Sequence, residues 1–330
     1  MQAVDKLAFD SLLYSEKFTV YDGFEPSGTM HIGQGLLKII NVYNMLDYPN
    51  CEYIILLADI FADLNMKCEG ITSIIKENGE KMIAIWKKFG LDNDRVKYLW
   101  SSKEIEKDPL KYFGIVFDIS KKFNISRINR CTTIMGRSET ETLKVSQIFY
   151  PVMQCADIFY LGVDVCQMGM DQRKLNMLAK EYAEKMHFPK PIVWCQPMLP
   201  SLSGKGKMSK SDPKSSIFMT DTPEEVEKKI KKAFCEEGNI ENNPILEYFK
   251  YILYPFLEQV QKREHLKKMY DYPSLESLYV SIGKEVRIYP INSDYIDILY
   301  DRFSKGDLTP QDLKMSASHI ISTILSPLHS

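Results

Sequence analysis

Three short apolar runs, separated by stretches with helical spacing, constrain the fold of this 330-residue chain most strongly. They are Tyr53 to Ala58 (YIILLA), Val96 to Trp100 (VKYLW) and Pro191 to Cys195 (PIVWC). Each has the length and composition of a strand that a parallel sheet buries on both faces. Before the first run and between the first and the second, apolar side chains recur at helical intervals: Leu36, Leu37, Ile39, Ile40, Tyr43 and Leu46, then Ile75, Met82, Ile83 and Trp86. This alternation predicts an α/β protein with a doubly wound parallel sheet, in which ligands bind beyond the carboxyl ends of the strands.

The chain changes character after about residue 217. The segment 221–234 (DTPEEVEKKIKKAF) predicts a helix with Asp221 as N-cap, a proline in the first turn and acidic residues near the positive end of the helix dipole. Helical patterns dominate from there to the end. We therefore expect one domain over 1–216 and a mostly helical domain over 217–330, with residues 200–216 as the linker.

The composition is that of an ordinary soluble globular protein, with 45% hydrophobic and 26% charged residues. No apolar window is long enough to span a membrane, and the acidic residues of the N-terminal segment do not fit a signal peptide, so we expect an intracellular protein. The seven cysteines are scattered and no histidine lies at ligand spacing from them, which argues against zinc and disulfides. With a net charge of −2, any nucleic-acid surface must be local.

Two glycine-containing segments carry the candidate chemistry. Residues 21–34 (YDGFEPSGTMHIGQ) combine glycines with His31 directly before a helical pattern, as a nucleotide phosphate requires, although a tight turn explains them equally well. Residues 204–213 (GKGKMSKSDP) hold three lysines in a segment with nothing to bury. Alone, such a loop is more often a solvated surface. Their conjunction, one at the first strand-to-helix connection and one after the last strand, favours a shared function in binding phosphate.

These segments resemble the signatures of class I aminoacyl-tRNA synthetases: residues 31–34 (HIGQ) are similar to HIGH, and residues 207–211 match KMSKS. Five further segments resemble tyrosyl-tRNA synthetases of the archaeal and eukaryotic type: GFEPSG at 23–28, LLAD at 56–59, YPVMQCADI at 150–158, LGVDV at 161–165 and GMDQRK at 169–174. The resemblance covers nearly the whole chain. It implies a Rossmann-type catalytic domain over 1–216 with a dimerisation insertion near 108–150, and an anticodon-binding domain over 217–330.

The implied activity is the ATP-dependent conversion of tyrosine to tyrosyl-adenylate and pyrophosphate, followed by transfer of tyrosine to the 3′ end of tRNA(Tyr). The implied partners are tyrosine, ATP with the Mg²⁺ that it carries, tRNA(Tyr) and a second copy of the chain. The implied location is the cytoplasm, with no resident metal and no membrane contact.

The resemblance assigns catalysis to His31, Lys207 and Lys210. Attack of a carboxylate on the α-phosphorus builds charge on phosphate oxygens, and lysines on a glycine-flanked loop can close on the triphosphate and then release pyrophosphate. The implied ATP contacts are Gly23, Glu25, Ser27, Gly33, Gln34, Met208, Ser209 and Ser211. Gln34 departs from the signature, because its amide can donate a hydrogen bond but cannot carry the charge of an imidazolium.

For tyrosine, the resemblance implies that Tyr21 and Asp157 hold the phenol oxygen, with an ionised Asp157 as acceptor and Tyr21 as donor. Tyr150, Gln154 and Gln172 resemble the residues that hold the α-amino group. Tyr150, Gln154 and Asp157 share one face of a helix by their spacing. An ordinary amphipathic helix would do the same, but a buried carboxylate in an apolar stretch needs a ligand or a donor.

On the tRNA side, Asp312 aligns with an aspartate that contacts the first anticodon base in archaeal relatives, while Thr309 replaces a histidine found in some of them. Lysines at 228, 229, 231 and 232 fit either a phosphate-tracking face or a solvated helix face. Two other readings stay open at this point. One is a tryptophanyl-tRNA synthetase, which shares the architecture, and the other is a non-catalytic RNA-binding paralogue, which would have no need for two small-molecule sites.

Overall fold

The computed structural model describes residues 2–3, 6–136, 142–210, 212–270, 277–282, 285–290 and 295–329. Its contacts divide the chain into two compact units. The first unit holds Met1–Gly28, Asn44–Ile83 and Asn93–Pro197, and the second holds Thr29–Tyr43, Ala84–Asp92 and Met198–Ser330. The predicted boundary between functional domains at residue 216 stays a prediction.

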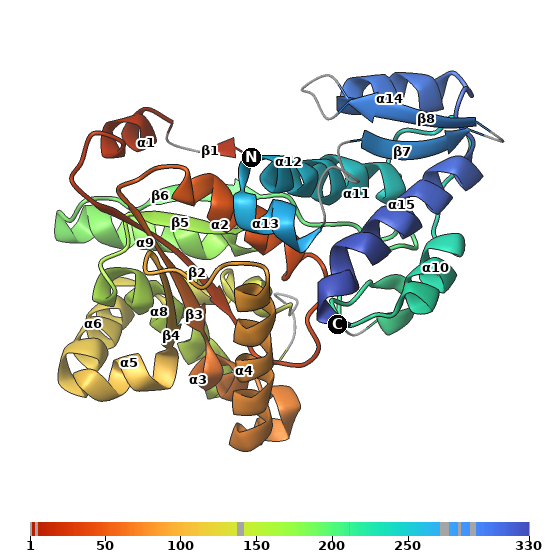
Figure 1. Ribbon diagram of the computed structural model, residues 1–330. Coiled ribbons are helices and arrows are strands. Elements are labelled where there is room, and N and C mark those ends of the chain that lie inside the picture. Colours follow the sequence, from red (N-terminus) through yellow and green to blue (C-terminus); the bar gives the residue numbers. More distant parts are fainter. Residues whose placement is uncertain are drawn as a thin grey trace. The chain divides into compact units, whose positions relative to one another are not determined.

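The first unit contains a six-stranded sheet in the order β1-β6-β5-β2-β3-β4 (Figure 1). The strands are β1 (Gln2–Ala3), β2 (Phe18–Phe24), β3 (Cys51–Leu57), β4 (Val96–Trp100), β5 (Val165–Gly169) and β6 (Ile192–Gln196). Strands β2 to β6 are parallel, and β1 pairs antiparallel with β6 at one edge. The doubly wound parallel sheet is confirmed, and the three apolar runs form β3, β4 and β6. The strand order reverses direction between β2 and β5, where such sheets place their ligands.

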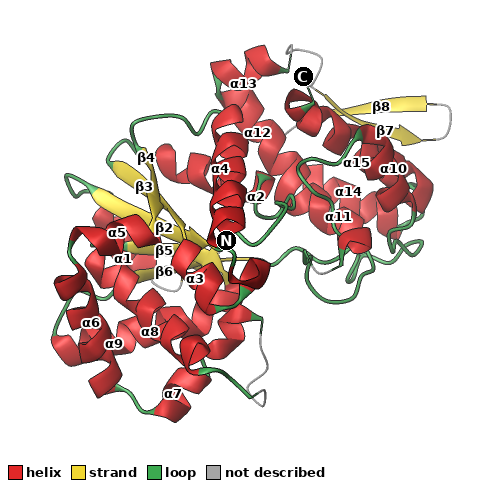
Figure 2. Ribbon diagram, turned by 90° about the horizontal axis from the view of Figure 1, so that it is seen from below, coloured by secondary structure: helices red, strands yellow, loops and turns green. Residues whose placement is uncertain are grey.

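The helices of the first unit pack against this sheet, and the hydrophobic core lies between the two. They are α1 (Lys6–Leu12), α3 (Asp59–Leu64), α4 (Thr72–Lys88), α5 (Ser101–Lys107), α6 (Pro109–Lys122), α7 (Ile125–Asn129), α8 (Val145–Tyr160) and α9 (Arg173–Met186), with short turns η1 (Lys67–Gly70), η2 (Thr132–Met135) and η3 (Met170–Gln172). Helices α6, α8 and α9 pack together on one side of the sheet (Figure 2). Strand residues such as Leu56 and Met168 pack there with Cys155 of α8 and Leu178 of α9, and all four are buried.

The second unit is mostly helical, as the sequence predicts. It contains α2 (Leu36–Leu46) up to Tyr43, η4 (Pro213–Ser215), α10 (Pro223–Lys231), α11 (Pro244–Tyr248), the π-helical turn η5 (Phe249–Leu253), α12 (Tyr254–Lys262), α13 (Glu264–Met269), α14 (Tyr295–Ser304), α15 (Pro310–Leu325) and η6 (Ser326–Leu328). It also contains an antiparallel pair that the sequence analysis did not predict, β7 (Ser277–Ile282) and β8 (Glu285–Pro290).

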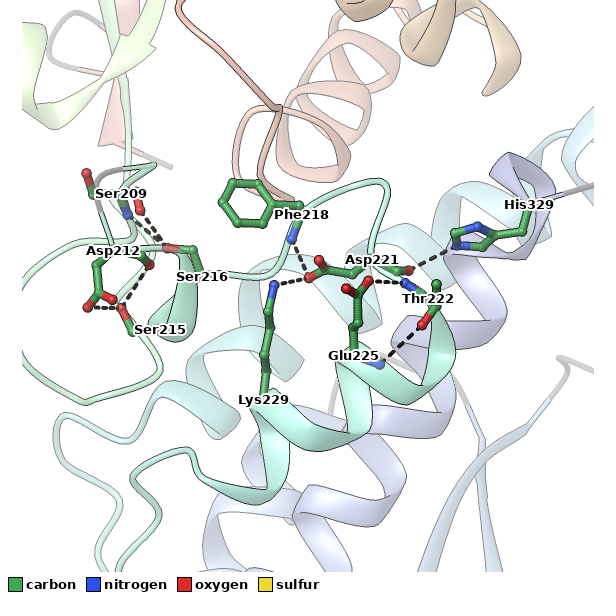
Figure 3. A network of polar contacts seen from close by, with 10 residues as sticks. All are labelled: Ser209, Asp212, Ser215, Ser216, Phe218, Asp221, Thr222, Glu225, Lys229 and His329. Carbon is green, nitrogen blue, oxygen red and sulfur yellow. Dashed lines mark hydrogen bonds and ion pairs between the residues drawn. The ribbon is translucent and has the colours of Figure 1, made fainter.

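The start of α10 differs from the prediction by one residue. Thr222, and not Asp221, is the N-cap: its hydroxyl accepts a hydrogen bond from the Glu225 N–H at 3.3 Å, and the Glu225 carboxylate accepts from the Thr222 N–H at 2.9 Å (Figure 3). This reciprocal pair is a capping box, which a Thr-x-x-Glu sequence favours. The prediction of Asp221 as N-cap was wrong because its carboxylate has other partners.

In the part of the chain that the structure describes, no helix has both the length and the apolar character needed to cross a bilayer. Within the same residues, no group of three or more histidine, cysteine, aspartate or glutamate side chains is arranged to hold a metal ion.

Candidate active site

The five predicted tyrosine-site side chains and one further residue, Tyr112, gather in the first unit, near the reversal of strand order. We call this group the α8 cluster, and its members are Tyr21, Tyr112, Tyr150, Gln154, Asp157 and Gln172. Tyr21 lies on β2, next to β5, and Gln172 lies just after the carboxyl end of β5. The remaining members lie on α8, apart from Tyr112 of α6. The cluster therefore occupies the place that the doubly wound fold offers to ligands.

Asp157 is the most unusual member because it is a carboxyl group with only 4% exposure. The Tyr112 hydroxyl donates a hydrogen bond to its Oδ1 at 2.8 Å, while its Oδ2 has no partner among the described residues. Burial raises the pKa of Asp157 to about 8, and the Tyr112 hydrogen bond opposes that rise only in part. Burial therefore opposes the ionised form that we expected for this carboxylate.

Tyr21 supplies a donor beside this carboxyl group. Its side chain is 1% exposed, and burial, followed by the charge of Asp157, raises its pKa well above the ordinary value. The phenol therefore stays protonated. Gly23 explains how the hydroxyl has room, since a Cβ at that position would lie 3.1 Å from the Tyr21 oxygen. A side chain at residue 23 would crowd the group that we expect to bind substrate.

Gln154 and Gln172 are hydrogen-bonded to each other. The Gln154 amide donates to Gln172 Oε1 at 3.2 Å, and the Gln172 amide donates to the backbone oxygen of Ile134 at 3.1 Å. This chain fixes the orientation of both amides. It leaves Gln154 Oε1 buried and without a partner among the described residues. An oxygen in that state is an acceptor for a donor that a ligand brings.

Tyr150 contacts a predicted ATP-site residue. Its side chain is buried near Glu25, whose Oε1 accepts a hydrogen bond from the Asn65 amide at 2.9 Å. Burial, followed by the Glu25 charge, raises the pKa of Tyr150 well above the ordinary value. Ser27, also a predicted ATP contact, donates its backbone N–H to the Glu25 carbonyl at 2.8 Å and so holds the turn after β2.

Sequence reasoning missed Tyr112 and Asn65. Tyr112 lies on the buried face of α6 and is separated from Asp157 by 45 residues, and Asn65 is separated from Glu25 by 40 residues. Neither position belongs to a recognisable motif. A buried tyrosine on an amphipathic helix gives no sign in the sequence that its hydroxyl binds a distant carboxyl group.

In the second unit, the His31 segment pairs with the chain that follows the lysine loop, defined here as residues 204–210. Residues 30–32 form a short antiparallel ladder with residues 217–219, through backbone hydrogen bonds of 2.8 and 2.9 Å, with His31 opposite Phe218. The His31 segment is therefore joined through its backbone, within one unit, to the chain that follows the lysine loop.

His31 is neutral in this setting. Burial, followed by the charges of Lys210 and Lys207, lowers its pKa from 6.5 to about 3. Its Nδ1 accepts a hydrogen bond from the Gln34 N–H at 3.3 Å. Gly33 allows close packing, because a Cβ there would lie 3.2 Å from both the His31 ring and Leu199. The charges of Lys207 and Lys210 therefore act on His31, and all three residues belong to the second unit.

Gln34 is held mainly through its backbone, whose carbonyl accepts from the Trp86 indole at 3.1 Å. Its side-chain Oε1 is buried and has no partner within the described residues. The role of this departure from the signature stays a prediction.

The lysine loop itself is anchored at its middle. Gly204 and Gly206 have φ values of +72° and +70°, a backbone region that favours glycine. The Met208 N–H donates to the Leu199 carbonyl at 2.7 Å, and the Met208 side chain is buried. Met208 is thus an anchor of the loop. Ser209 bonds Ser216 through its backbone, and the predicted contact Ser211 lies outside the described residues.

Asp312, the predicted anticodon contact, caps α15. Its Oδ2 accepts from the Thr309 N–H at 3.1 Å and from the Thr309 hydroxyl at 2.7 Å, and the Thr309 hydroxyl accepts from the Asp312 N–H at 3.2 Å. This capping box accounts for the spacing of the two residues. Whether Asp312 also contacts RNA stays a prediction.

Comparison with known proteins gives one family. The family model of class I tRNA synthetases for tryptophan and tyrosine matches residues 14–326. The tyrosine–tRNA ligase 1, cytoplasmic, of Arabidopsis thaliana is 46% identical, with coverage of 93% of this chain and 75% of that protein. The tyrosine–tRNA ligase of Picrophilus torridus is 36% identical, over 93% of this chain and 89% of its own length. A tyrosyl-tRNA synthetase structure from Leishmania major, in complex with tyrosinol, matches with a TM-score of 0.84 and 34% identity; it covers 99% of this chain, which spans 47% of that one.

Proposed function

Since the chain belongs to the class I tRNA synthetases for tryptophan and tyrosine, we propose that it is a tyrosine–tRNA ligase, which activates tyrosine with ATP and transfers it to tRNA(Tyr). One observation in the structure carries the choice of amino acid. Asp157 Oδ2 and Gln154 Oε1 are buried acceptors on one helix, and neither has a partner among the described residues. Tyrosine brings two matching donors, its phenol O–H and its α-ammonium group.

Selection against phenylalanine follows from Asp157 Oδ2 and the Tyr21 hydroxyl. With tyrosine bound, the phenol O–H donates to Asp157 and its oxygen accepts from the Tyr21 hydroxyl. Phenylalanine would leave both groups buried and unpaired, which costs about 1–3 kcal/mol for each group. Tryptophan offers only an N–H donor and no acceptor for Tyr21, so the pair Tyr21 and Asp157 disfavours the tryptophanyl alternative.

Activation requires the triphosphate to be held by the second unit. Lys207 and Lys210 are the cations that bind phosphate oxygens as charge develops on them, and His31 contributes a neutral imidazole. Because its pKa is about 3, His31 acts as a hydrogen-bond donor and not as a positive charge. The Mg²⁺ that ATP carries enters with the substrate. A non-catalytic RNA-binding paralogue would need none of these groups.

We place the tRNA(Tyr) anticodon on the helical region 217–330, with Asp312 as a contact. The Asp312 Oδ2 already accepts two hydrogen bonds from Thr309, so this contact would have to coexist with the cap of α15. Thr309, which replaces the histidine of some relatives, is the N-cap residue of α15. The name of the Arabidopsis relative includes the cytoplasm, and we assign the same location to this chain.

We also propose that two copies of the chain form a homodimer. Helix α6 exposes Leu110 (89%), Phe113 (37%) and Phe117 (55%), which lie along one side of the helix by their spacing. An exposed apolar stripe of this kind is typical of an interface. Sedimentation at micromolar concentration should give twice the monomer mass, and Phe117→Glu should shift the distribution towards monomer. A monomeric wild-type protein would contradict the dimer without affecting the proposed chemistry.

The test of the proposed function is amino-acid-dependent exchange of labelled pyrophosphate into ATP, without tRNA, using tyrosine, tryptophan and phenylalanine in separate reactions. We expect exchange with tyrosine alone. Exchange with tryptophan would keep the fold and overturn the role of Asp157, and no exchange from well-folded protein would favour the non-catalytic paralogue.

A further inference from the structure

The segment between the lysine loop and α10 is held by an unusual set of polar contacts (Figure 3). At its start, Ser216 is fully buried, and its hydroxyl both donates to the Ser209 carbonyl at 2.8 Å and accepts from the Ser209 N–H at 3.2 Å. One side chain thus replaces a pair of backbone hydrogen bonds. This contact ties the C-terminal part of the lysine loop to the residue just before the ladder with the His31 segment.

The middle of the segment is the ladder itself. Phe218 lies opposite His31, and the flanking residues Ile217 and Met219 are fully buried. Gly35 lies so close to Met219 that a Cβ at residue 35 would overlap its sulfur. The residues on both sides of Phe218 are thus bonded to the His31 segment, and Ser216, two residues earlier, is bonded to Ser209 of the lysine loop.

The end of the segment is fixed by Asp221. Its Oδ2 accepts from the Phe218 N–H at 2.8 Å and from the Lys229 ammonium at 2.6 Å. Lys229 also lies 4.7 Å above the centroid of the Phe218 ring, so it contacts both the carboxylate and the residue that this carboxylate holds. The Asp221 carbonyl bonds His329 Nε2 at 3.0 Å, near the end of the chain.

This ion pair is largely buried: Asp221 is 6% exposed, and the Lys229 side chain is 18% exposed. Removing two charges from water is costly, and a buried pair is often no more stabilising than apolar residues of the same size. Such a pair does, however, fix the position and orientation of the Asp221 carboxylate, and therefore of the Phe218 N–H that donates to it. Neither predicted role of Lys229, tracking RNA phosphates or lying on a solvated helix face, fits an ammonium group in this position.

We propose that Asp221, held by Lys229, is a positioning residue for ATP activation: it fixes Phe218, and through Phe218 it sets the distance between His31 and the lysine loop. The inference rests on the proposed function. Asp221 and Lys229 act on the reaction only through the backbone that they hold. Misplacing a reacting or binding group by about 1 Å can lower a rate on the order of a hundredfold.

Two variants separate the hydrogen bond that positions Phe218 from the charges of Asp221 and Lys229. Asp221→Ala removes the acceptor for Phe218 and leaves the Lys229 charge without its partner. We expect the kcat of tyrosine-dependent pyrophosphate exchange to fall about ten- to a hundredfold, while the Kd for tyrosine, whose proposed site lies in the first unit, stays unchanged. The neutral pair Asp221→Asn with Lys229→Met keeps an oxygen for the Phe218 N–H and keeps the bulk of both side chains. Its kcat should return to within about threefold of the wild type.

A second measurement reports on the loop without catalysis. Trypsin cleaves after exposed lysines, so the rate of cleavage after Lys205, Lys207 and Lys210 under native conditions measures how firmly the loop is held. Cleavage in Asp221→Ala should be at least fivefold faster than in the wild type and should return towards the wild-type rate in the neutral pair, by mass spectrometry of the fragments. The matched control is Val260→Ala, which removes buried methyl groups from α12 and no contact of this segment.

The two measurements test the positioning role of Asp221 and the proposed function separately. Wild-type kcat and wild-type cleavage in Asp221→Ala would overturn the proposal. An equal loss of kcat in Val260→Ala, at a similar loss of thermal stability, would reduce Asp221 to a structural residue and also overturn it. If the wild type supports no exchange at all, the proposed function fails, and the trypsin experiment alone then decides whether Asp221 holds the loop.

Discussion

The α8 cluster of the first unit and the segment from the lysine loop to Asp221 in the second unit treat their polar groups in opposite ways. In the cluster, Asp157 and Gln154 each keep a buried oxygen without a partner among the described residues. In the second unit, Ser209 and Phe218 have backbone groups that are bonded to the side chains of Ser216 and Asp221. The cluster is organised to lack something that a ligand supplies, whereas the loop segments are organised to be held in place.

This difference follows from what each region would bind. A tyrosine side chain is small and rigid, so fixed acceptors can select it. The free-energy cost of burying these acceptors without a partner is offset only when a ligand brings the correct donors. A triphosphate must be bound more tightly as it reacts and then released as pyrophosphate, which requires cations on a segment with defined anchor points. The following predictions test this contrast.

The largest effect should come from Asp157→Ala. The variant removes the proposed acceptor for the phenol and leaves the Tyr112 hydroxyl without its Asp157 partner. Truncating one member of a buried, charge-assisted hydrogen bond costs about 2–5 kcal/mol, so kcat/KM for tyrosine should fall about 10³-fold. Pyrophosphate exchange at varied tyrosine concentration measures it, and circular dichroism verifies the fold. Wild-type tyrosine affinity in a folded variant would falsify the assignment of Asp157.

Lys210→Met should have a smaller effect of a different kind. The substitution removes one cation that would bind the triphosphate and retains the length of the side chain. Loss of one stabilising donor lowers kcat by about 10²-fold, whereas the Kd for tyrosine, measured by calorimetry without ATP, should not change. Lys214→Met, on the exposed turn η4, is a matched control and should keep full activity. A weaker affinity for tyrosine in Lys210→Met would break the separation of the two regions.

Features made of contiguous residues could be predicted from the sequence, whereas contacts between residues far apart in the sequence could not. The strands β3, β4 and β6 were predictable because each is a continuous apolar run, and the two signatures are contiguous residues. Tyr112 and Asn65 were not, since their partners lie 45 and 40 residues away and no local pattern marks them. Asp221 was assigned to the wrong task, as an aspartate before a helix resembles an N-cap until its actual partners, Phe218 and Lys229, are known.

The unfilled state of the α8 cluster also predicts a pH dependence. The pKa of Asp157 is raised from 3.8 to about 8 by burial, so the folded protein holds a proton that the unfolded chain has released between these values. The contribution of this carboxyl group to stability is therefore full below pH 3.8 and is lost as the pH rises towards 8. Asp157→Asn should remove this decline, which urea denaturation at pH 6 and pH 8.5 can measure.

Binding of tyrosine should respond in the opposite direction to stability. If the carboxylate must be ionised to accept the phenol hydrogen, the competent fraction rises from about a tenth at pH 7 to about three quarters at pH 8.5 for a pKa of about 8. Tyrosine affinity should then increase roughly tenfold over that range. Calorimetry of the wild type and Asp157→Asn separates this effect from titration of the ligand, which is common to both. Affinity that falls as the pH rises would mean that a protonated Asp157 donates to the phenol oxygen. In that case the cluster would present a donor where we infer an acceptor, and the contrast with the lysine loop would rest on Gln154 alone.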